Sequence, residues 1–151
     1  MEFIVKAKYC KIDDNGKQKN VTESYIIPAI SFAEAELRAY AILEMIVDGD
    51  FSVDTITKSK INDYLLDDAA DNFYTVKVQH VGIDEDSGKE QKVNTLILIQ
   101  CDSNKSAIDG VNEDLQNMIV PYEIVSTKKE AFIEVFSEET YKIFLENNAN
   151  T

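Results

Sequence analysis

Two acidic turns are the first residues in this sequence whose types and spacing could do chemistry. They read DDNGK at residues 13–17 and DEDSGK at residues 84–89, and both resemble the start of an EF-hand calcium loop. Such a loop also needs a glutamate at its twelfth position, which binds calcium through both oxygens. Ser24 and Thr95 stand there instead. The pattern therefore predicts hairpin turns, with a weak cation site as the alternative.

Cysteine and histidine are the next candidates. The chain has one histidine, His80, and two cysteines, Cys10 and Cys101. A nucleophilic thiol needs a base within hydrogen-bond reach, but strand alternation predicts Cys101 on an inner face and Cys10 on an outer one. Zinc needs four ligands, or three and a water. We therefore expect structural roles for these side chains, with no catalytic residue, metal or cofactor.

Lysines crowd the N-terminal hairpin and could form a phosphate-binding face; they are Lys6, Lys8, Lys17 and Lys19. The net charge of the chain is −13, however, and a polyanion repels phosphate backbones and anionic lipid heads. Bulk nucleic-acid binding and a membrane partner are therefore disfavoured. We expect a solvated outer sheet face, with a local groove for an anionic ligand or single-stranded nucleic acid as the alternative.

Length and charge set the remaining bounds. A chain of 151 residues is the size of one domain, or of two small ones that share a core. The negative charge is spread over both halves, which is typical of a self-repelling surface; the alternative is a surface for a basic partner, or a mimic of nucleic acid. Neither a signal segment nor a membrane-length apolar run is visible. We expect a cytoplasmic protein, and the oligomeric state stays open.

The strands, turns and helices that are expected to position these residues occur twice in the sequence. Shifting the chain by roughly 71–72 residues places VKAKYCKIDDNGKQKNV on VKVQHVGIDEDSGKEQKV. The matches continue through the pairs Ile27/Ile99, Ser31/Ser103, Ala35/Ala107 and Leu43/Leu115. Because each match falls at the same structural place, the sequence indicates an internal duplication.

Each repeat begins with a strand whose side chains alternate, a glycine-containing turn and a return strand. Ser31 and Glu34 predict a capping box at the start of a helix, and Asp102 or Ser103 caps the second helix. A third strand follows the helix. If its connection is the usual right-handed crossover, it lies parallel to the second strand and beside the first.

The predicted fold is therefore α+β: two ββαβ units, or ββαββ units, with mainly antiparallel sheets and a short C-terminal helix. Residues 1–151 are expected to form a single compact domain. Its expected parts are two repeats, 1–66 and 73–136, a linker at 67–72 and a C-terminal helix at 137–148. Segments 60–66 and 130–136 fit either a strand or a helical turn.

The stretches VTESYIIPAISFAEAELR and FYTVKVQHVGIDEDSGKEQK, with VKAKY before them, resemble a family of short proteins from Bacteroidetes that is known as a domain of unknown function. The resemblance spans nearly the whole chain. It implies a bacterial, cytoplasmic protein of the same duplicated build, and it carries no catalytic or ligand residues to transfer.

Three classes of function follow. The favoured one is a non-enzymatic interaction or assembly protein that binds a protein partner through a sheet face or edge. The second is a small-ligand-binding protein that uses a cleft between the repeats, lined by Tyr9, Tyr25, His80 and Tyr122. The third is an enzyme that uses cysteine or histidine; native thiols that stay unreactive near neutral pH would exclude that nucleophile.

Overall fold

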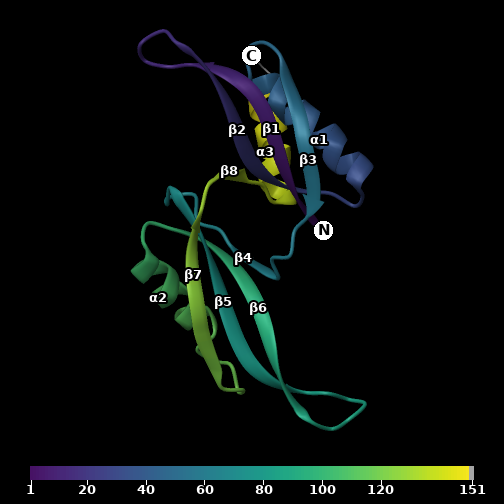
Figure 1. The fold of residues 1–151 in the computed structure, drawn as a ribbon, viewed down its shortest axis with the longest axis vertical. Helices are drawn as coiled ribbons and strands as arrows, with labels where there is room; N and C mark the ends of the chain where they lie inside the picture. Colours follow the sequence, from purple (N-terminus) through teal and green to yellow (C-terminus); the bar gives the residue numbers. More distant parts are fainter. Residues whose placement is uncertain (150–151) are drawn as a thin grey trace. The chain divides into compact units, whose positions relative to one another are not determined.

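The computed structural model describes residues 1–149, which form eight strands and three helices (Figure 1). In chain order the elements are β1 (Glu2–Ile12), β2 (Gln18–Pro28), α1 (Phe32–Ile46), β3 (Phe51–Lys58), β4 (Asp63–Leu65), β5 (Asn72–Ile83), β6 (Glu90–Cys101), α2 (Asn104–Asp114), β7 (Tyr122–Glu130), β8 (Phe132–Val135) and α3 (Glu138–Ala149). The α+β class and the C-terminal helix are confirmed.

The strands form two mixed sheets, in the orders β3-β1-β2-β8 and β4-β6-β5-β7. In the first sheet β1 is antiparallel to both β2 and β3, so β3 runs parallel to β2 with β1 between them. In the second sheet β5 separates β6 from β7 in the same way. The predicted place of the third strand of each repeat is therefore confirmed.

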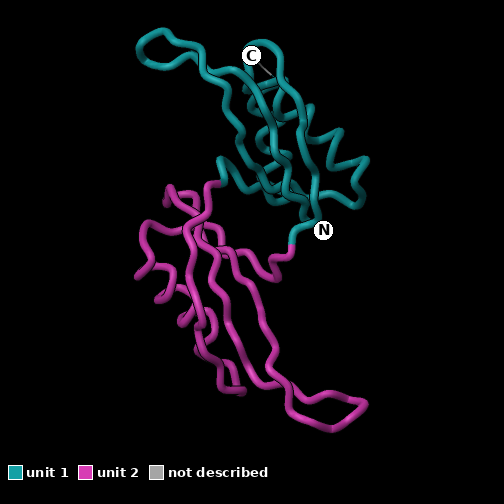
Figure 2. Tube along the Cα trace, viewed as in Figure 1, with its two compact units in different colours: residues 1–59, 132–151 teal, residues 60–131 magenta. Residues whose placement is uncertain are grey.

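The chain divides into two compact units whose limits differ from those of the sequence repeats (Figure 2). Unit 1 contains Met1–Ser59 and the chain from Phe132 onward, and unit 2 contains Lys60–Ala131. The segments that fitted either strand or helix contain strands β4 and β8. Each repeat is therefore ββαββ in element order.

The last strand of each repeat completes the sheet of the other unit. Strand β4, from the first repeat, pairs in parallel with β6 in unit 2. Strand β8, from the second repeat, pairs in parallel with β2 in unit 1. The two repeats thus exchange their final strands.

Local details recur in both repeats. The β1–β3 pairing shifts register between Lys6 and Ala7, and the β5–β7 pairing shifts between Lys77 and Val78, at the equivalent place. Both helices start at a serine in extended conformation, whose hydroxyl accepts a backbone N–H at 3.1 Å. The Glu34 carboxylate, the other member of the predicted capping box, pairs with Arg38 at 3.1 Å.

Each unit has its own apolar core on the helix-bearing face of its sheet. In unit 1, α1 and α3 pack on this face, and their buried side chains join the inner row of β1 and β2 (Figure 1). In unit 2, α2 covers the same face through Ala107 and Val111. Gly110 lets α2 approach β6 closely, because a Cβ there would collide with Cδ1 of Ile99.

Candidate functional site

The acidic turns close the long hairpins, as expected. Asp13 accepts the backbone N–H of Asn15 at 2.9 Å, and Asp84 accepts that of Asp86 at 2.8 Å. Gly16 has a φ of 79°, a conformation that the turn requires and that glycine adopts without strain. Both turns therefore use these aspartates to hold their own backbone.

Cys101 and His80 belong to unit 2, and the exposed Cys10 belongs to unit 1. Cys101 is buried in unit 2 and faces Asn72 across the sheet, whereas His80 is eight residues farther along β5, about 26 Å away in an extended strand. Burial raises the pKa of the Cys101 thiol, a backbone hydrogen bond with Ser103 opposes this in part, and the nearby Asp102 carboxylate adds to the rise. The structure therefore does not bring His80 to Cys101 as a dyad.

Tyr9 and Tyr25, two of the predicted ligand residues, meet at one carboxylate in unit 1. The Tyr9 hydroxyl donates to Glu23 Oε2, and the Tyr25 hydroxyl donates to the same oxygen at 3.4 Å. Lys11 Nζ pairs with the other oxygen, Glu23 Oε1. The sequence prediction missed Glu23, although it shares the inner face of β2 with Tyr25 and strand alternation could have placed it there.

The charges of this cluster follow from burial and hydrogen bonding. Burial first, and then the nearby Glu23 carboxylate, raise the pKa of Tyr9 far above its usual value. Burial also raises the pKa of Tyr25 to about 12. Burial alone would raise the pKa of Glu23, but the hydrogen bonds from Lys11 and Tyr9 outweigh it and hold that pKa below its usual range.

Replacing Glu23 with glutamine should destabilise unit 1 in a pH-dependent way. The lowered pKa of Glu23 stabilises the folded state above the usual glutamate range, and this contribution is lost as the pH falls through the folded value. We expect Glu23→Gln to cost about 1–3 kcal/mol near neutral pH. Urea denaturation should show the gap to wild type shrinking between about pH 7 and pH 3.

The control for this variant is Glu44→Gln, at an exposed glutamate of α1. It should change the free energy of unfolding by less than about 0.5 kcal/mol at either pH. A gap between Glu23→Gln and wild type that stays constant with pH would contradict the assigned role of the carboxylate.

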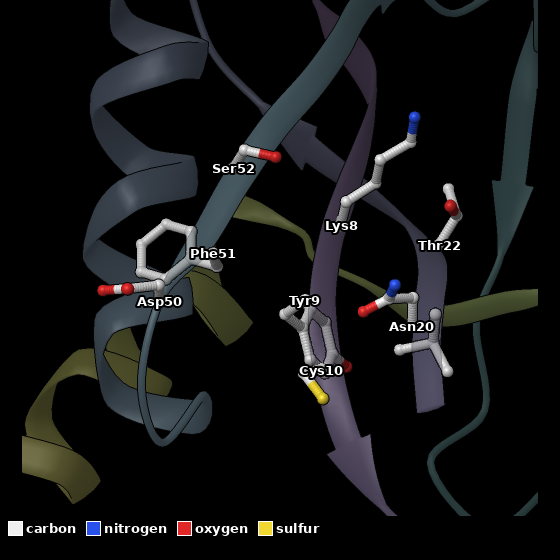
Figure 3. Close-up of a pocket in the computed structure, with 9 residues that line it drawn as sticks. Lys8, Tyr9, Cys10, Asn20, Thr22, Asp50, Phe51 and Ser52 are labelled. Atoms are coloured by element: carbon white, nitrogen blue, oxygen red, sulfur yellow. The ribbon is translucent and has the colours of Figure 1, made fainter. Parts of the chain in front are cut away.

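Two hollows border the Tyr9 end of unit 1. One, of about 540 Å³, lies beside Tyr9, Glu23 and Tyr25. The other, of about 580 Å³, is open and lies across β1, β2 and β3, where Lys8, Cys10 and Thr22 project from the strands (Figure 3). The Lys8 ammonium lies 3.5 Å from Asp54, so this lysine is partly neutralised on an exposed sheet face.

The other two predicted ligand residues belong to unit 2. His80 and Tyr122 face each other across β5 and β7. The Tyr122 hydroxyl donates to Asn112 Oδ1 of α2 at 2.9 Å. The structure thus brings together Tyr9 with Tyr25, and His80 with Tyr122, and a cleft shared by all four stays a prediction.

A groove in unit 1 runs between α1 and strand β3, which is an edge strand of its sheet. We call it the α1–β3 groove; its volume is about 330 Å³, and its lining is Phe32, Glu36, Tyr40, Val53, Asp54, Thr55 and Ile56. Phe32, Glu36 and Tyr40 are spaced by one helical turn, so they line one face of α1. Phe32 and Tyr40 are 55% and 38% exposed.

Aromatic contacts hold the two ends of the α1–β3 groove. The Phe32 ring meets Phe3 of β1 edge to face, with ring centroids 4.9 Å apart. The Tyr40 ring lies 5.6 Å from that of Phe51 at the start of β3. Such contacts restrict both rings while leaving one side of each exposed, which gives the groove fixed apolar walls.

The same place in unit 2 is bridged by polar side chains. The repeat alignment puts Asn104, Ile108 and Asn112 of α2 where α1 has Phe32, Glu36 and Tyr40. Asn112 accepts from Tyr122 at 2.9 Å, and Asn104 accepts from Thr127 of β7 at 3.4 Å. Hydrogen bonds therefore tie α2 to the edge strand of unit 2, whereas the α1–β3 groove is open and has aromatic, aliphatic and acidic side chains in its lining.

The described helices include none that is both long and apolar enough to cross a membrane. Within residues 1–149, no group of three or more histidine, cysteine, aspartate or glutamate side chains is placed to hold a metal ion.

Comparison with curated proteins and with solved structures gives no match. Residues 2–138 match the family described as a domain of unknown function, DUF4494, and the chain belongs to that family.

Proposed function

We propose that this protein is a non-enzymatic interaction protein that binds an extended segment of a protein partner in the α1–β3 groove. The segment adds as a strand to the outer edge of β3, and its alternate side chains enter the groove against α1. This is the β-augmentation mode of peptide recognition, in which backbone hydrogen bonds give affinity and pockets give specificity. The cytoplasmic location expected from the sequence is part of the same proposal.

The observation that supports the proposal is a difference between the two repeats, which otherwise share the same order of strands and helix. Both edge strands carry the same register shift, which increases local twist and limits indiscriminate pairing. The helix positions that face the edge strand are mainly aromatic in unit 1, whereas in unit 2 they include two asparagines that bond to β7. A structural requirement common to both repeats would not produce this difference.

The lining of the groove defines the chemistry of the partner. Its apolar side chains favour apolar residues at every second position of the bound strand. Glu36 adds negative charge, Asp54 adds less because Lys8 pairs with it at 3.5 Å, and the lining itself contains no lysine or arginine. With the net charge of −13, this favours a lysine or arginine at the one of these groove-facing positions that lies beside Glu36.

The test is an NMR titration of the full chain with a ten-residue peptide that has threonine at every second position and valine or lysine, in turn, at the positions between, so that valine and lysine side chains both face the groove. We expect amide shifts along residues 51–58 and at Phe32, Glu36 and Tyr40. Glu36→Lys should weaken binding about fivefold, since one partly exposed charge pair contributes about 1 kcal/mol. Glu36 is exposed, so this variant should fold normally.

The matched control is Glu44→Lys, which makes the same charge change on α1 outside the groove lining. It should leave the affinity within about twofold of wild type. The same peptide with glutamate in place of each lysine should bind far more weakly. Equal weakening by both variants, or shifts along residues 122–130 of unit 2, would refute the groove as the binding site.

A small-ligand site is the second candidate, and the hollow of about 540 Å³ beside Tyr9 and Tyr25 favours it. The polar groups there already satisfy one another, because both tyrosine hydroxyls and the Lys11 ammonium bind Glu23. A ligand would have to replace these bonds at a cost. This hollow therefore supports ligand binding less strongly than the open groove supports peptide binding.

A further inference from the structure

Helix α3 covers part of the unit 1 sheet, beside α1. Tyr141 of α3 is buried in the unit 1 core together with Phe136, which lies between β8 and the helix. The Arg38 guanidinium of α1 lies 4.5 Å from the centre of the Tyr141 ring and 2.8 Å from Glu138 Oε1. The seam between α1 and α3 therefore has an apolar floor and a charged rim.

Unit 2 has a hollow at the place that corresponds to α3. After β4 the chain turns at residues 66–71 and continues into β5, so no helix equivalent to α3 follows. A hollow of about 620 Å³ lies there, lined in part by Leu65, Ile99 and Gly110. We call it the α2–β4 hollow.

Residues that line the α2–β4 hollow stand at the same repeat positions as residues that meet α3 in unit 1. Gly110 is the repeat equivalent of Arg38, and Ile99 is that of Ile27, a member of the unit 1 core. Leu98 of β6 is the repeat equivalent of Ile26 of β2. Leu65 comes directly after the residue that pairs with Leu98, and Phe136 comes directly after the residue that pairs with Ile26. Unit 1 therefore shows what kind of element this surface accepts.

The rim of the hollow is acidic. Asp67, Glu113 and Asp114 line it together with apolar side chains, and its lining contains no lysine or arginine. Helix α3 itself carries three glutamates and one lysine, so the α3 helix of a second copy would meet like charge. Electrostatic complementarity instead favours a cationic helix.

We propose that the α2–β4 hollow docks an amphipathic helix of a partner protein, with an apolar stripe flanked by lysine or arginine. The apolar stripe takes the place that Tyr141 and Phe144 occupy in unit 1, and the basic residues meet the carboxylates of the rim. Helix-in-groove docking of this kind places residues at i, i+3, i+4 and i+7 on the groove floor. The site is separate from the α1–β3 groove and does not depend on it.

The experiment titrates the full chain with a synthetic 15-residue helical peptide that has a leucine stripe flanked by lysines, and follows amide shifts by NMR. We expect the largest shifts at Leu65, Ile99 and Gly110. Asp114→Lys should weaken binding about fivefold. This variant places a cation at the last residue of α2, where the helix dipole favours it, so folding should be retained.

The control is Asp109→Lys, at an exposed aspartate of α2 outside the hollow lining. It should leave the affinity within about twofold of wild type. Equal weakening by Asp109→Lys and Asp114→Lys would show general charge attraction and overturn the proposal. So would shifts confined to unit 1, tighter binding of a peptide of residues 137–149, or the absence of shifts at about 1 mM peptide.

Discussion

Ending the chain after Ala131 should unfold unit 1 and leave unit 2 folded. The truncation removes β8 and α3, which belong to the second repeat in sequence but complete unit 1 in space. Unit 1 loses the buried Phe136 and Tyr141 side chains, and removing even one large buried aromatic costs about 3–5 kcal/mol. Two such losses are comparable to the whole stability of a typical domain.

Hydrogen exchange read by NMR or mass spectrometry distinguishes the two units. Amides of β1, β2 and α1 should lose their protection in the truncated chain, whereas those of β5 and β6 should keep it. A chain that ends at Asn147 is the control, because it keeps β8 and the core residues of α3, and both units should stay protected. Loss of protection confined to β5–β7 would show that the final strand supports its own repeat and would contradict the exchange.

The repeated part of the fold was predictable because its signals are local. Alternation over Phe3–Tyr9 marks a strand, Asp14-Asn15-Gly16 marks a hairpin turn, and Ser31 marks a helix start. Each signal depends on neighbours within a few residues, so tertiary contacts do not change it. The matching signals in the second repeat support every assignment twice.

The exchange of strands was not predicted, because residues 60–66 and 130–136 are short and carry no decisive periodicity. Their pairing depends on reach. The position at the outer edge of β6, which β4 occupies, lies three strand spacings from β7, about 14 Å across the sheet. Glu130 and Phe132 are two residues apart in sequence, a span of at most about 7 Å. Strand β8 therefore cannot complete the sheet of its own repeat.

Two equivalent places exist, beside β2 and beside β6. Since β8 cannot reach the one beside β6, it pairs with β2, and β4 is left to take the place beside β6. This argument needs the strand limits to within a residue or two, which the sequence did not provide. With those limits known, chain length alone requires the exchange.

The candidate sites were only partly accessible from sequence for a related reason. The repeat alignment already contains the contrast of Phe32 and Tyr40 with Asn104 and Asn112. Whether this contrast creates a groove depends on which residues of the edge strand face the helix, and therefore on the register of β3 and β7. The α2–β4 hollow depends on parts of the chain that are still farther apart in sequence. It lies in unit 2 at the place where, in unit 1, helix α3 of the second repeat covers the sheet.

Cutting the folded chain between Asp68 and Ala69 should leave its two fragments assembled. The cut falls in the exposed turn that follows β4. The N-terminal fragment keeps β4, which pairs in the unit 2 sheet, and the C-terminal fragment keeps β8 and α3, which complete unit 1. Each fragment thus holds a strand of the other's sheet, so separation requires breaking both sheets.

A protease site inserted between these two residues allows the test, with cleavage after folding. The fragments should elute together in size-exclusion chromatography, and the urea midpoint should rise with protein concentration, since unfolding now separates two chains. The same cut in the chain that ends at Ala131 removes one exchanged segment, and its N-terminal fragment should be unfolded. Two fragments that elute separately, each folded with its own final strand, would refute the interlocked topology, because neither could then depend on a strand from the other.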